Sequence, residues 1–483
     1  MGYPRWGLLS ASLLLASCTG DNTIIASTVA ELKQAIDTAN MTGVQTVISL
    51  ASGSHALDLS TPHSEPLGEE LCAGATGLVV KSGSHVTIHG NGFTLSRSGG
   101  PEFRIFYVDP NASLTLNDLT VTGGLLSTSS GSRGGGICNA GKLALVRSAV
   151  RDNGAHLGGG IANVAPEGTG SAGDGTTTLT TSRVEENEAF THGGGIYNLR
   201  RFSELMPKLS LTDSSVRTNR AFDAGGVFNE GGELHLDRST LSENKASKNG
   251  GAIVNLYGTA QLTNVTLSGN TAAGDVGAMS NVTGASATLT HVTVTRNAAG
   301  KKHGGLKNKG KQLQLVNTIV AQNTDDGTAP DCFGAPASGG HNLIGDATGC
   351  GFTPLGTDIV GVVDPRLGPL QDNGGPTHTH ALLDADAPSP ASPAVDAAGD
   401  CNPPTATDAR GQPRPADGDG DGMAYCDIGA YEKQPKNDRC HERDRDERRD
   451  EDWRRDEDER IEEDRCDDED PRSDEGEKRR ARH

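Results

Sequence analysis

The stretch Asn219-Arg-Ala-Phe-Asp-Ala-Gly-Gly-Val-Phe-Asn229 decides the fold, because variants of it recur between residues 133 and 323. Each copy reads Asn-x-Ala, a short spacer, a step of small residues, an aliphatic residue, any residue and Asn. The copies begin at Asn153, Asn187, Asn219, Asn244, Asn270 and Asn297, after a half copy at 134–139. The later copies recur every 26 or 27 residues, whereas the earlier ones carry insertions. Such a period indicates a repeat architecture in which each unit stacks on the next.

Short alternating segments between these motifs predict β-strands, for example at residues 142–146, 233–236 and 261–267. Alternation of this kind, bounded by Gly and Asn, is typical of strands and turns. One unit cannot bury its apolar face alone, so a coil of about two dozen residues must pair with the coils above and below it. The sequence therefore predicts an all-β fold, a parallel β-helix (solenoid), with the aliphatic residue of each copy in the core.

The last Asn of each copy is expected at a corner of the coil. Stacked amides can bond to each other and to turn backbone, and Asn and Gly tolerate the left-handed backbone that corners need. The expected ladder is Asn139, Asn163, Asn198, Asn229, Asn255, Asn281 and Asn308. We interpret these residues as structural, and the Gly pairs as tight turns rather than phosphate loops, since they open no helix.

The repeat resembles the Gly-Gly-x-Ile and Phe-x-x-Asn repeats of polymorphic outer-membrane proteins and related bacterial β-helix proteins. Here Val or Leu usually stands where those families prefer Phe, as in Val184-Glu-Glu-Asn187. The resemblance implies a single-stranded right-handed parallel β-helix of the pectin-lyase-like kind, with its regular repeats in residues 132–324. A fold hosts many activities, so this resemblance is specific for fold and weak for function.

Residues 1–17 are similar to a lipoprotein signal peptide. Arg5 supplies a positive charge, and the apolar run 8–16 is too short to span a bilayer. The run ends Leu15-Ala-Ser-Cys18, which resembles the lipobox of bacterial lipoproteins; the alternative is an ordinary signal with an incidental Cys. The resemblance implies acylation of Cys18, and the acyl chains would hold the protein at a membrane. Thr19 after the Cys favours the outer membrane in that family, so the expected location is the bacterial cell envelope.

Residues 28–40 are expected to form a helix that caps the solenoid. Val29, Leu32 and Ile36 have helical spacing, and Thr28 with Glu31 forms a capping-box pattern. A helix at this place would cover the open end of the aliphatic core, as a solenoid requires. Residues 18–131 are therefore expected to comprise this cap and the first, less regular coils.

Charge and cysteine content agree with an exported protein. The formal net charge of −20 argues against a nucleic-acid partner. The chain has nine Cys, and the eight that remain after Cys18 are an even number, which predicts disulfides without fixing their connectivity. Their spacing does not suit zinc. Proximity in sequence favours Cys332–Cys350, Cys401–Cys426 and Cys440–Cys466.

Residues 325–433 resemble the bacterial C-terminal domain called choice-of-anchor Q. The matching motifs include residues 364–370, 373–381, 392–396, 407–411 and 426–432. That family follows β-helices on exported proteins with various surface anchors. This chain departs from it by lacking a recognisable C-terminal sorting signal, and the lipobox would take that role.

Residues 434–483 contain 15 basic and 22 acidic residues. A segment of this composition cannot bury enough apolar surface to fold, so we expect a disordered charged tail.

The run Asp417-Gly-Asp-Gly-Asp-Gly422 is the candidate metal site. Alternating carboxylates with Gly at the sixth place match the start of an oxygen-rich Ca²⁺ loop. The twelfth place is Ile428 instead of a bidentate acid, so the alternative is a flexible acidic turn. The expected ligands of Ca²⁺ are Asp417, Asp419 and Asp421.

A candidate binding face follows from strand geometry. The residue between the inward aliphatic and the Asn of each copy should point outward, because side chains alternate along a strand. Tyr197, Phe228 and Val254 form the apolar middle of this column. They would make an exposed interaction strip, unless the insertions at 164–178 and 199–207 or the C-terminal domain bury it.

Two functions remain open. Pectate lyases and polygalacturonases share the predicted fold, but they need a basic residue beside Ca²⁺-binding carboxylates or a close set of acids. Residues 323–326 resemble a hydrolase motif without its partner motifs, and the basic run 301–311 could hold an acidic glycan. We expect a surface-anchored, non-catalytic β-helix lipoprotein, adhesive or structural, that binds a polysaccharide or a cell-surface protein. The alternative is a polysaccharide lyase or glycoside hydrolase acting on an acidic glycan along the β-helix groove.

Overall fold

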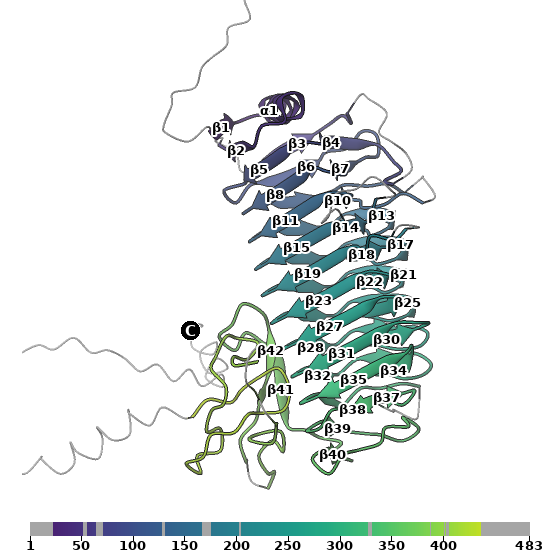
Figure 1. Ribbon diagram of the computed structural model, residues 1–483, viewed down its shortest axis with the longest axis vertical. Helices are drawn as coiled ribbons and strands as arrows, with labels where there is room; N and C mark the ends of the chain where they lie inside the picture. The colour runs from purple at the N-terminus through teal and green to yellow at the C-terminus, as the bar shows by residue number, and fades with distance from the viewer. Residues whose placement is uncertain are drawn as a thin grey trace, which may run out of the picture. The chain divides into compact units, whose positions relative to one another are not determined.

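The computed structural model describes residues 23–51, 56–63, 71–127, 131–166, 175–201, 204–326, 331–386, 388–399, 401 and 405–435. Four parallel β-sheets run along a right-handed solenoid of about 11 turns (Figure 1). The all-β parallel β-helix predicted from the repeat is confirmed. The predicted charged tail lies outside the described residues, except for its first two positions.

The sheets are named A to D, and the strands of each are given in their order along the solenoid. Sheet A contains β1 (Thr23–Ala26), β2 (Thr46–Leu50), β5 (His85–His89), β8 (Ser113–Asn117), β11 (Lys142–Val146), β15 (Thr176–Thr180), β19 (Lys208–Thr212), β23 (Glu233–Asp237), β27 (Thr259–Thr263), β31 (Ser286–Thr290), β35 (Gln312–Val316) and β38 (Ala337–Ser338). Sheet B contains β3 (Ala56–Leu59), β6 (Thr94–Arg97), β9 (Thr120–Thr122), β12 (Ala149–Arg151), β16 (Arg183–Glu185), β20 (Ser215–Arg217), β24 (Thr240–Ser242), β28 (Thr266–Ser268), β32 (Thr293–Thr295), β36 (Ile319–Ala321), β39 (Leu343–Ile344) and β40 (Ile359–Val360). Sheet C contains β4 (Thr76–Val80), β7 (Arg104–Val108), β10 (Ile137–Asn139), β14 (Ile161–Val164), β18 (Ile196–Leu199), β22 (Val227–Glu230), β26 (Ile253–Leu256), β30 (Met279–Val282), β34 (Leu306–Lys309) and β37 (Cys332–Phe333). Sheet D contains β13 (Gly154–Leu157), β17 (Glu188–His192), β21 (Arg220–Asp223), β25 (Lys245–Asn249), β29 (Thr271–Ala272) and β33 (Ala298–Ala299).

One continuous apolar core runs through the coils. In β11, Leu143 and Leu145 point inward and are buried, and they pair in register with Thr177 and Leu179 of the next coil. This alternation follows from the geometry of a strand, in which successive side chains face opposite ways. The predicted aliphatic column of sheet C is fully buried and consists of Ile137, Ile161, Ile196, Val227, Ile253, Met279 and Leu306.

The helix α1 (Val29–Thr42) covers the N-terminal end of this core, as predicted (Figure 1). Thr28 Oγ1 accepts a hydrogen bond from Glu31 N, and the Glu31 carboxylate accepts one from Thr28 N, so the capping box is complete. Its buried face contacts β1 to β5, and Gly43 ends the helix with left-handed backbone, φ 64°. None of the helical residues that the structure describes forms a span of membrane-crossing length and hydropathy.

The predicted Asn ladder lies at the corner where sheet C leads into sheet A. Asn229 Nδ2 donates to Asn255 Oδ1 at 2.8 Å, and Asn255 Nδ2 donates to Asn281 Oδ1 at 2.9 Å. The same bond joins every successive pair from Asn139 to Asn308. The column is fully buried from Asn139 to Asn281, so its polar groups depend on each other and on nearby backbone.

A second Asn ladder lies at the corner between sheets B and D. Asn219 N and Nδ2 both donate to Asn244 Oδ1, at 3.1 and 3.0 Å. The ladder contains the first Asn of each repeat copy and one more, namely Asn153, Asn187, Asn219, Asn244, Asn270, Asn297 and Asn323. Asp331 ends it by accepting a bond from Asn323 Nδ2 at 2.8 Å.

A third ladder, of hydroxyl groups, lies at the corner between sheets A and B. Ser148 N donates to Ser182 Oγ at 3.1 Å, and Ser214 and Ser239 continue the series. The residue before each of these serines, such as Arg147 with φ 47°, has left-handed backbone. The expectation that the predicted ladder Asn residues make the left-handed turns is wrong, because none of them has positive φ.

The C-terminal part of the described chain lies against the outer face of sheet B (Figure 1). It carries an antiparallel pair, β41 (Leu367–Gln371) and β42 (Thr379–Leu382). Ser268 Oγ in β28 donates to His380 Nε2 at 2.9 Å, and His380 Nδ1 donates to the carbonyl of Gly368 at 2.7 Å. Burial lowers the pKa of His380 to about 4, so the imidazole is neutral. Its two nitrogens bond to Ser268 and Gly368, and the ring thereby links sheet B to the antiparallel pair.

We predict that Asn255→Leu lowers the stability of the solenoid. The substitution leaves the amide of Asn229 and the carbonyls of Asn281 and Ser286 with fewer partners. Each buried polar group that loses its partner costs about 1–3 kcal/mol. Chemical unfolding of the full chain measures the effect, with Gln261→Leu as control, since Gln261 is exposed in the same coil. An equal unfolding midpoint for the two variants would contradict the ladder's role.

Candidate functional site

The outward column of sheet C, predicted as a binding face, is buried. Tyr197, Phe228 and Val254 are 5%, 5% and 6% exposed. Their side chains form an apolar cluster outside the solenoid core, which also includes the corner residue Ala224. The ring of His192 packs against Phe228 with centroids 4.5 Å apart. The prediction of an exposed strip is therefore wrong: the column is buried in a cluster that includes Val164 and Leu199, the first residues of the two insertions. The C-terminal part, the other predicted cover, lies against sheet B instead.

A disulfide that the sequence did not suggest closes one end of this cluster. Cys72 and Cys138 are bonded although 66 residues separate them. Arg104 is fully buried beneath the Cys72 loop and donates to the carbonyls of Cys72 at 3.0 Å and Gly74 at 3.2 Å. Burial lowers the pKa of Arg104 to about 9. The disulfide and the arginine together hold the loop over sheet C.

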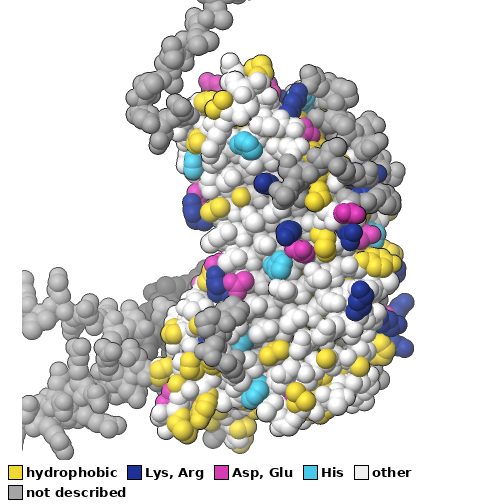
Figure 2. All heavy atoms as spheres, in the orientation of Figure 1, with side chains coloured by type: hydrophobic (Ala, Val, Ile, Leu, Met, Phe, Trp, Pro, Cys, Tyr) yellow, Lys and Arg dark blue, Asp and Glu magenta, His cyan; other side chains and the backbone are white. Residues whose placement is uncertain are grey.

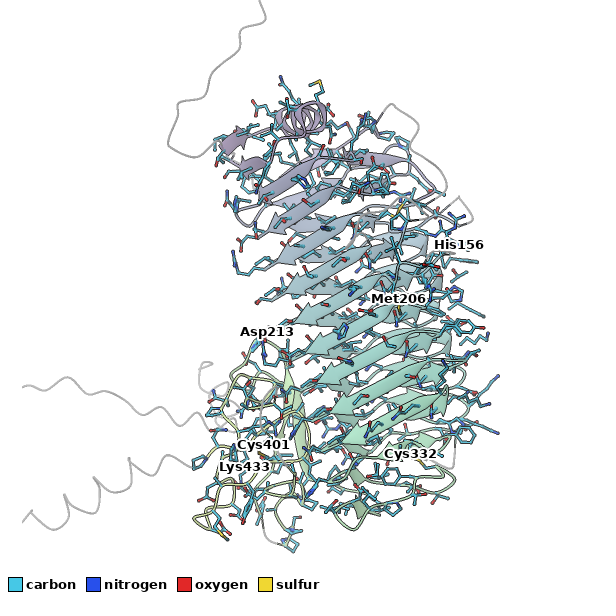
Figure 3. All side chains as sticks on the ribbon, viewed as in Figure 1. His156, Met206, Asp213, Cys332, Cys401 and Lys433 are labelled. Atoms are coloured by element: carbon cyan, nitrogen blue, oxygen red, sulfur yellow. A yellow bond between two sulfur atoms is a disulfide. The ribbon has the colours of Figure 1, made fainter. Side chains whose placement is uncertain are left out.

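The other cysteine predictions have mixed outcomes. The disulfides Cys332–Cys350 and Cys401–Cys426 are present as predicted, and Figure 3 labels one cysteine of each. The predicted pair Cys440–Cys466 and the lipidation residue Cys18 lie outside the described residues.

An open groove follows the outer face of sheet D. Its volume is about 940 Å³, and it crosses four coils, from β17 to β29. A column of buried alanines, Ala189, Ala221, Ala246 and Ala272, lies along the strands that carry it. These are the Ala residues of the Asn-x-Ala motif, and they alternate with the outward side chains that line the groove.

Two aromatic side chains stand exposed in the groove. Phe190 is 76% exposed and Phe222 is 46% exposed. His156, labelled in Figure 3, lies beside Phe190 with ring centroids 5.4 Å apart. Lys248 Nζ lies 5.2 Å from the ring centroid of Phe222. The sequence reasoning missed these residues, although their place two positions after Glu188 and Arg220 puts them on the outward face.

Charged and hydroxyl groups complete the groove. Glu188, Arg220, Lys245 and Thr271 stand in register on successive strands. Figure 2 shows Lys and Arg side chains gathered at the side of the solenoid where Figure 1 places β21 and β25. Of the described residues that line the groove, Glu188 alone carries a carboxylate. Glycoside hydrolysis ordinarily uses a pair of carboxylates, and the described lining of this groove holds one.

The segments that resembled enzyme motifs have structural contacts elsewhere. Asn323 belongs to the second ladder, and Asp325 accepts a hydrogen bond from His303 N at 3.1 Å. In the basic run 301–311, Lys307 Nζ bonds to Asp275 Oδ2 at 3.1 Å. These residues do not line the groove.

The predicted calcium ligands are only partly brought together. Ligand oxygens of Asp417 and Asp419 lie within 4.8 Å of one another and of Asp396, which precedes the run in the same C-terminal part. Asp421 is not in this group, and its Oδ1 accepts a bond from Met423 N at 2.8 Å. Burial, together with the charge of Asp419, raises the pKa of Asp396. The sequence could not assign Asp396, because the run that suggested the site begins at Asp417.

Calcium binding stays a prediction, and the geometry now names Asp396, Asp417 and Asp419 as the ligands to test. Asp419→Asn should abolish any rise in melting temperature that Ca²⁺ gives, because it removes a charge from the three-carboxylate group. Asp421→Asn removes the same charge outside that group and should retain the rise. Calorimetric titration of the full chain with CaCl₂ measures binding directly. Absence of heat at millimolar Ca²⁺, or equal effects of the two variants, would contradict a site at Asp396, Asp417 and Asp419.

Comparisons with protein-family models, with curated proteins and with solved structures gave no match for this chain.

Proposed function

We propose that this chain is a non-catalytic binding protein of the bacterial cell envelope that holds an extended polysaccharide in the groove on sheet D. The observation that carries the proposal is the pair Phe190 and Phe222, exposed on adjacent strands of an open groove. Exposed apolar side chains gathered in one place commonly mark an interaction site. Their flat faces suit the apolar faces of sugar rings.

The shape of the groove favours a linear ligand. Its walls repeat from coil to coil, and neighbouring strands of a sheet lie about 4.8 Å apart. A polymer laid along the solenoid axis would cross one strand at each coil and meet different outward side chains on each, first Glu188, then Arg220 and then Lys245. Arg220, Lys245 and Thr271 supply hydrogen-bond donors for its oxygen atoms. A cell-surface protein is the other possible partner class.

The location in the envelope is part of the same proposal. Three disulfides among the described cysteines favour an oxidising compartment. The lipobox-like Leu15-Ala-Ser-Cys18 favours anchoring through acyl chains, and the motifs in 364–432 that resemble choice-of-anchor Q favour a surface role.

The groove is tested by replacing both aromatic residues. Phe190→Ser with Phe222→Ser should weaken binding to polysaccharides that the parent chain retains on a glycan array by about tenfold or more, since exposed aromatic anchors dominate such contacts. The melting temperature should stay within about 2 °C, because neither ring is buried. Tyr425→Ser is the matched control, since Tyr425 is 51% exposed away from the groove.

Unchanged glycan binding by the double variant would contradict the groove as the binding site. Release of shortened or unsaturated sugars from a bound polysaccharide would instead favour the lyase or hydrolase alternative.

Anchoring is tested at the lipobox. Cys18→Ser should release the protein from the membrane fraction and abolish labelling with palmitate, because the acylated thiol is lost. Ser17→Ala keeps a small residue before the cysteine and should leave both unchanged. Membrane retention of unlabelled Cys18→Ser protein would contradict a lipid anchor.

A further inference from the structure

Exposed apolar side chains gather at the end of the solenoid where the described chain begins. Ile25, Met41 and Val44 are 51%, 79% and 60% exposed. They come from β1, from the last turn of α1 and from the loop that follows it, and β1 and α1 lie at the end opposite β39 and β40 (Figure 1). Among the described residues, the next exposed large apolar side chain along the sequence is that of Phe190. The first coils therefore confine such side chains to their N-terminal end.

The packing of the solenoid core does not use Met41 and Val44. The face of α1 that covers the core is complete without them and consists of Leu32, Ala35, Ile36 and Ala39. Asn40 Nδ2 donates to the carbonyl of Val79 at 2.8 Å, and Asn40 Oδ1 accepts from Lys81 N at 2.9 Å. These bonds fix the end of the helix to the coil beneath it, so the two apolar side chains are presented to the outside from a fixed position.

This end of the molecule carries little charge. Residues 23–50 contain three charged side chains, those of Glu31, Lys33 and Asp37, and the carboxylate of Glu31 is used in the capping box. No Asp, Glu, Lys or Arg occurs in residues 38–57, although such residues make up 22% of the whole chain. Exposed apolar side chains in a weakly charged setting mark a surface that contacts a partner or a membrane.

The tether between this end and the proposed lipid anchor is short. Cys18 precedes Thr23, the first described residue, by five positions. Five residues span at most about 18 Å, and the polar layer of one leaflet takes up about 5–8 Å of that length. Thr23 pairs with Val47, three residues after Val44, so Thr23 and Val44 are at most about 16 Å apart. An acylated Cys18 would therefore hold the exposed loop close to the bilayer surface.

We propose that the N-terminal end of the solenoid is seated on a phospholipid bilayer, with Met41 and Val44 in the headgroup layer. This inference rests on the proposed lipid anchor and adds a contact of the folded protein to it. Two apolar side chains give little membrane affinity by themselves, but a short tether keeps them at a high effective concentration near the lipid.

Seating of this end would orient the whole solenoid. The groove on sheet D begins at β17, which follows β15, and β15 is four strands beyond β2 in sheet A. At about 4.8 Å for each strand, the groove begins about 19 Å further along the axis than β2. The groove would thus be held clear of the headgroups and open to a ligand.

The test places the full lipidated chain in phosphatidylcholine vesicles and measures quenching of tryptophan fluorescence by brominated acyl chains. All variants carry Trp453→Phe, since Trp453 is the one tryptophan after Cys18. Met41→Trp and Val44→Trp should each lose at least about half of their fluorescence, because interfacial side chains reach the boundary between headgroups and acyl chains. Val363→Trp is the matched control and should keep its fluorescence, since Val363 is 73% exposed and follows β40 at the other end.

Flotation of the parent chain with the vesicles is measured first. A chain that does not float would overturn both the lipid anchor and the seating. If the chain floats and the three reporters are quenched equally, the anchor stands and the seating alone is overturned. Quenching of Met41→Trp and Val44→Trp that Val363→Trp does not share supports the seated end.

Discussion

Each coil of this solenoid buries amide and hydroxyl groups at its corners, and the neighbouring coil must satisfy them. Asn255 bonds to Asn229 on one side and Asn281 on the other, and the second Asn ladder repeats this at another corner. A buried polar group left alone costs about 1–3 kcal/mol, so a coil is stable only when its neighbours are in register. The ladders therefore fix the stacking of coils, while the aliphatic core supplies most of the driving force. At one end Asp331 closes the second ladder, and α1 covers the core at the other.

The fold and the first ladder could be predicted because the same residue types recur at equivalent positions in each copy of the repeat. The hydroxyl ladder could not be predicted, because the residue at that corner changes along the chain. It is Ser148 and Ser214 in earlier coils and Val265 and Val292 in later ones, and only the shape of the corner is constant. The residues with left-handed backbone at the corners could not be predicted either, because residues as unlike as Arg147 and Glu186 adopt this conformation. The candidate sites could be predicted less well, because a site brings together residues that the repeat spacing alone does not place side by side.

The sequence motifs of the C-terminal part have mainly structural contacts. Arg414 and Glu432 form an ion pair at 2.8 Å, and both side chains are fully buried. Arg414 also donates to the carbonyls of Asp427 and Gly429, so both of its terminal nitrogens are bonded within the fold. Removing one partner of such a pair leaves an unpaired buried charge and costs about 3–5 kcal/mol. These contacts give the residues of this sequence pattern a structural role.

The outer faces of the solenoid differ in what they leave accessible. Residues from the C-terminal part cover sheet B, and border residues cover the apolar column of sheet C. Sheet D keeps Phe190 and Phe222 exposed, although burying such a ring would contribute about 1.5–3 kcal/mol. The coil does not need them, since the inward stacking at these strands depends on other residues. A ligand that covers the two rings would recover the free energy of burial that the fold itself leaves unused, and on this ground we propose binding along sheet D.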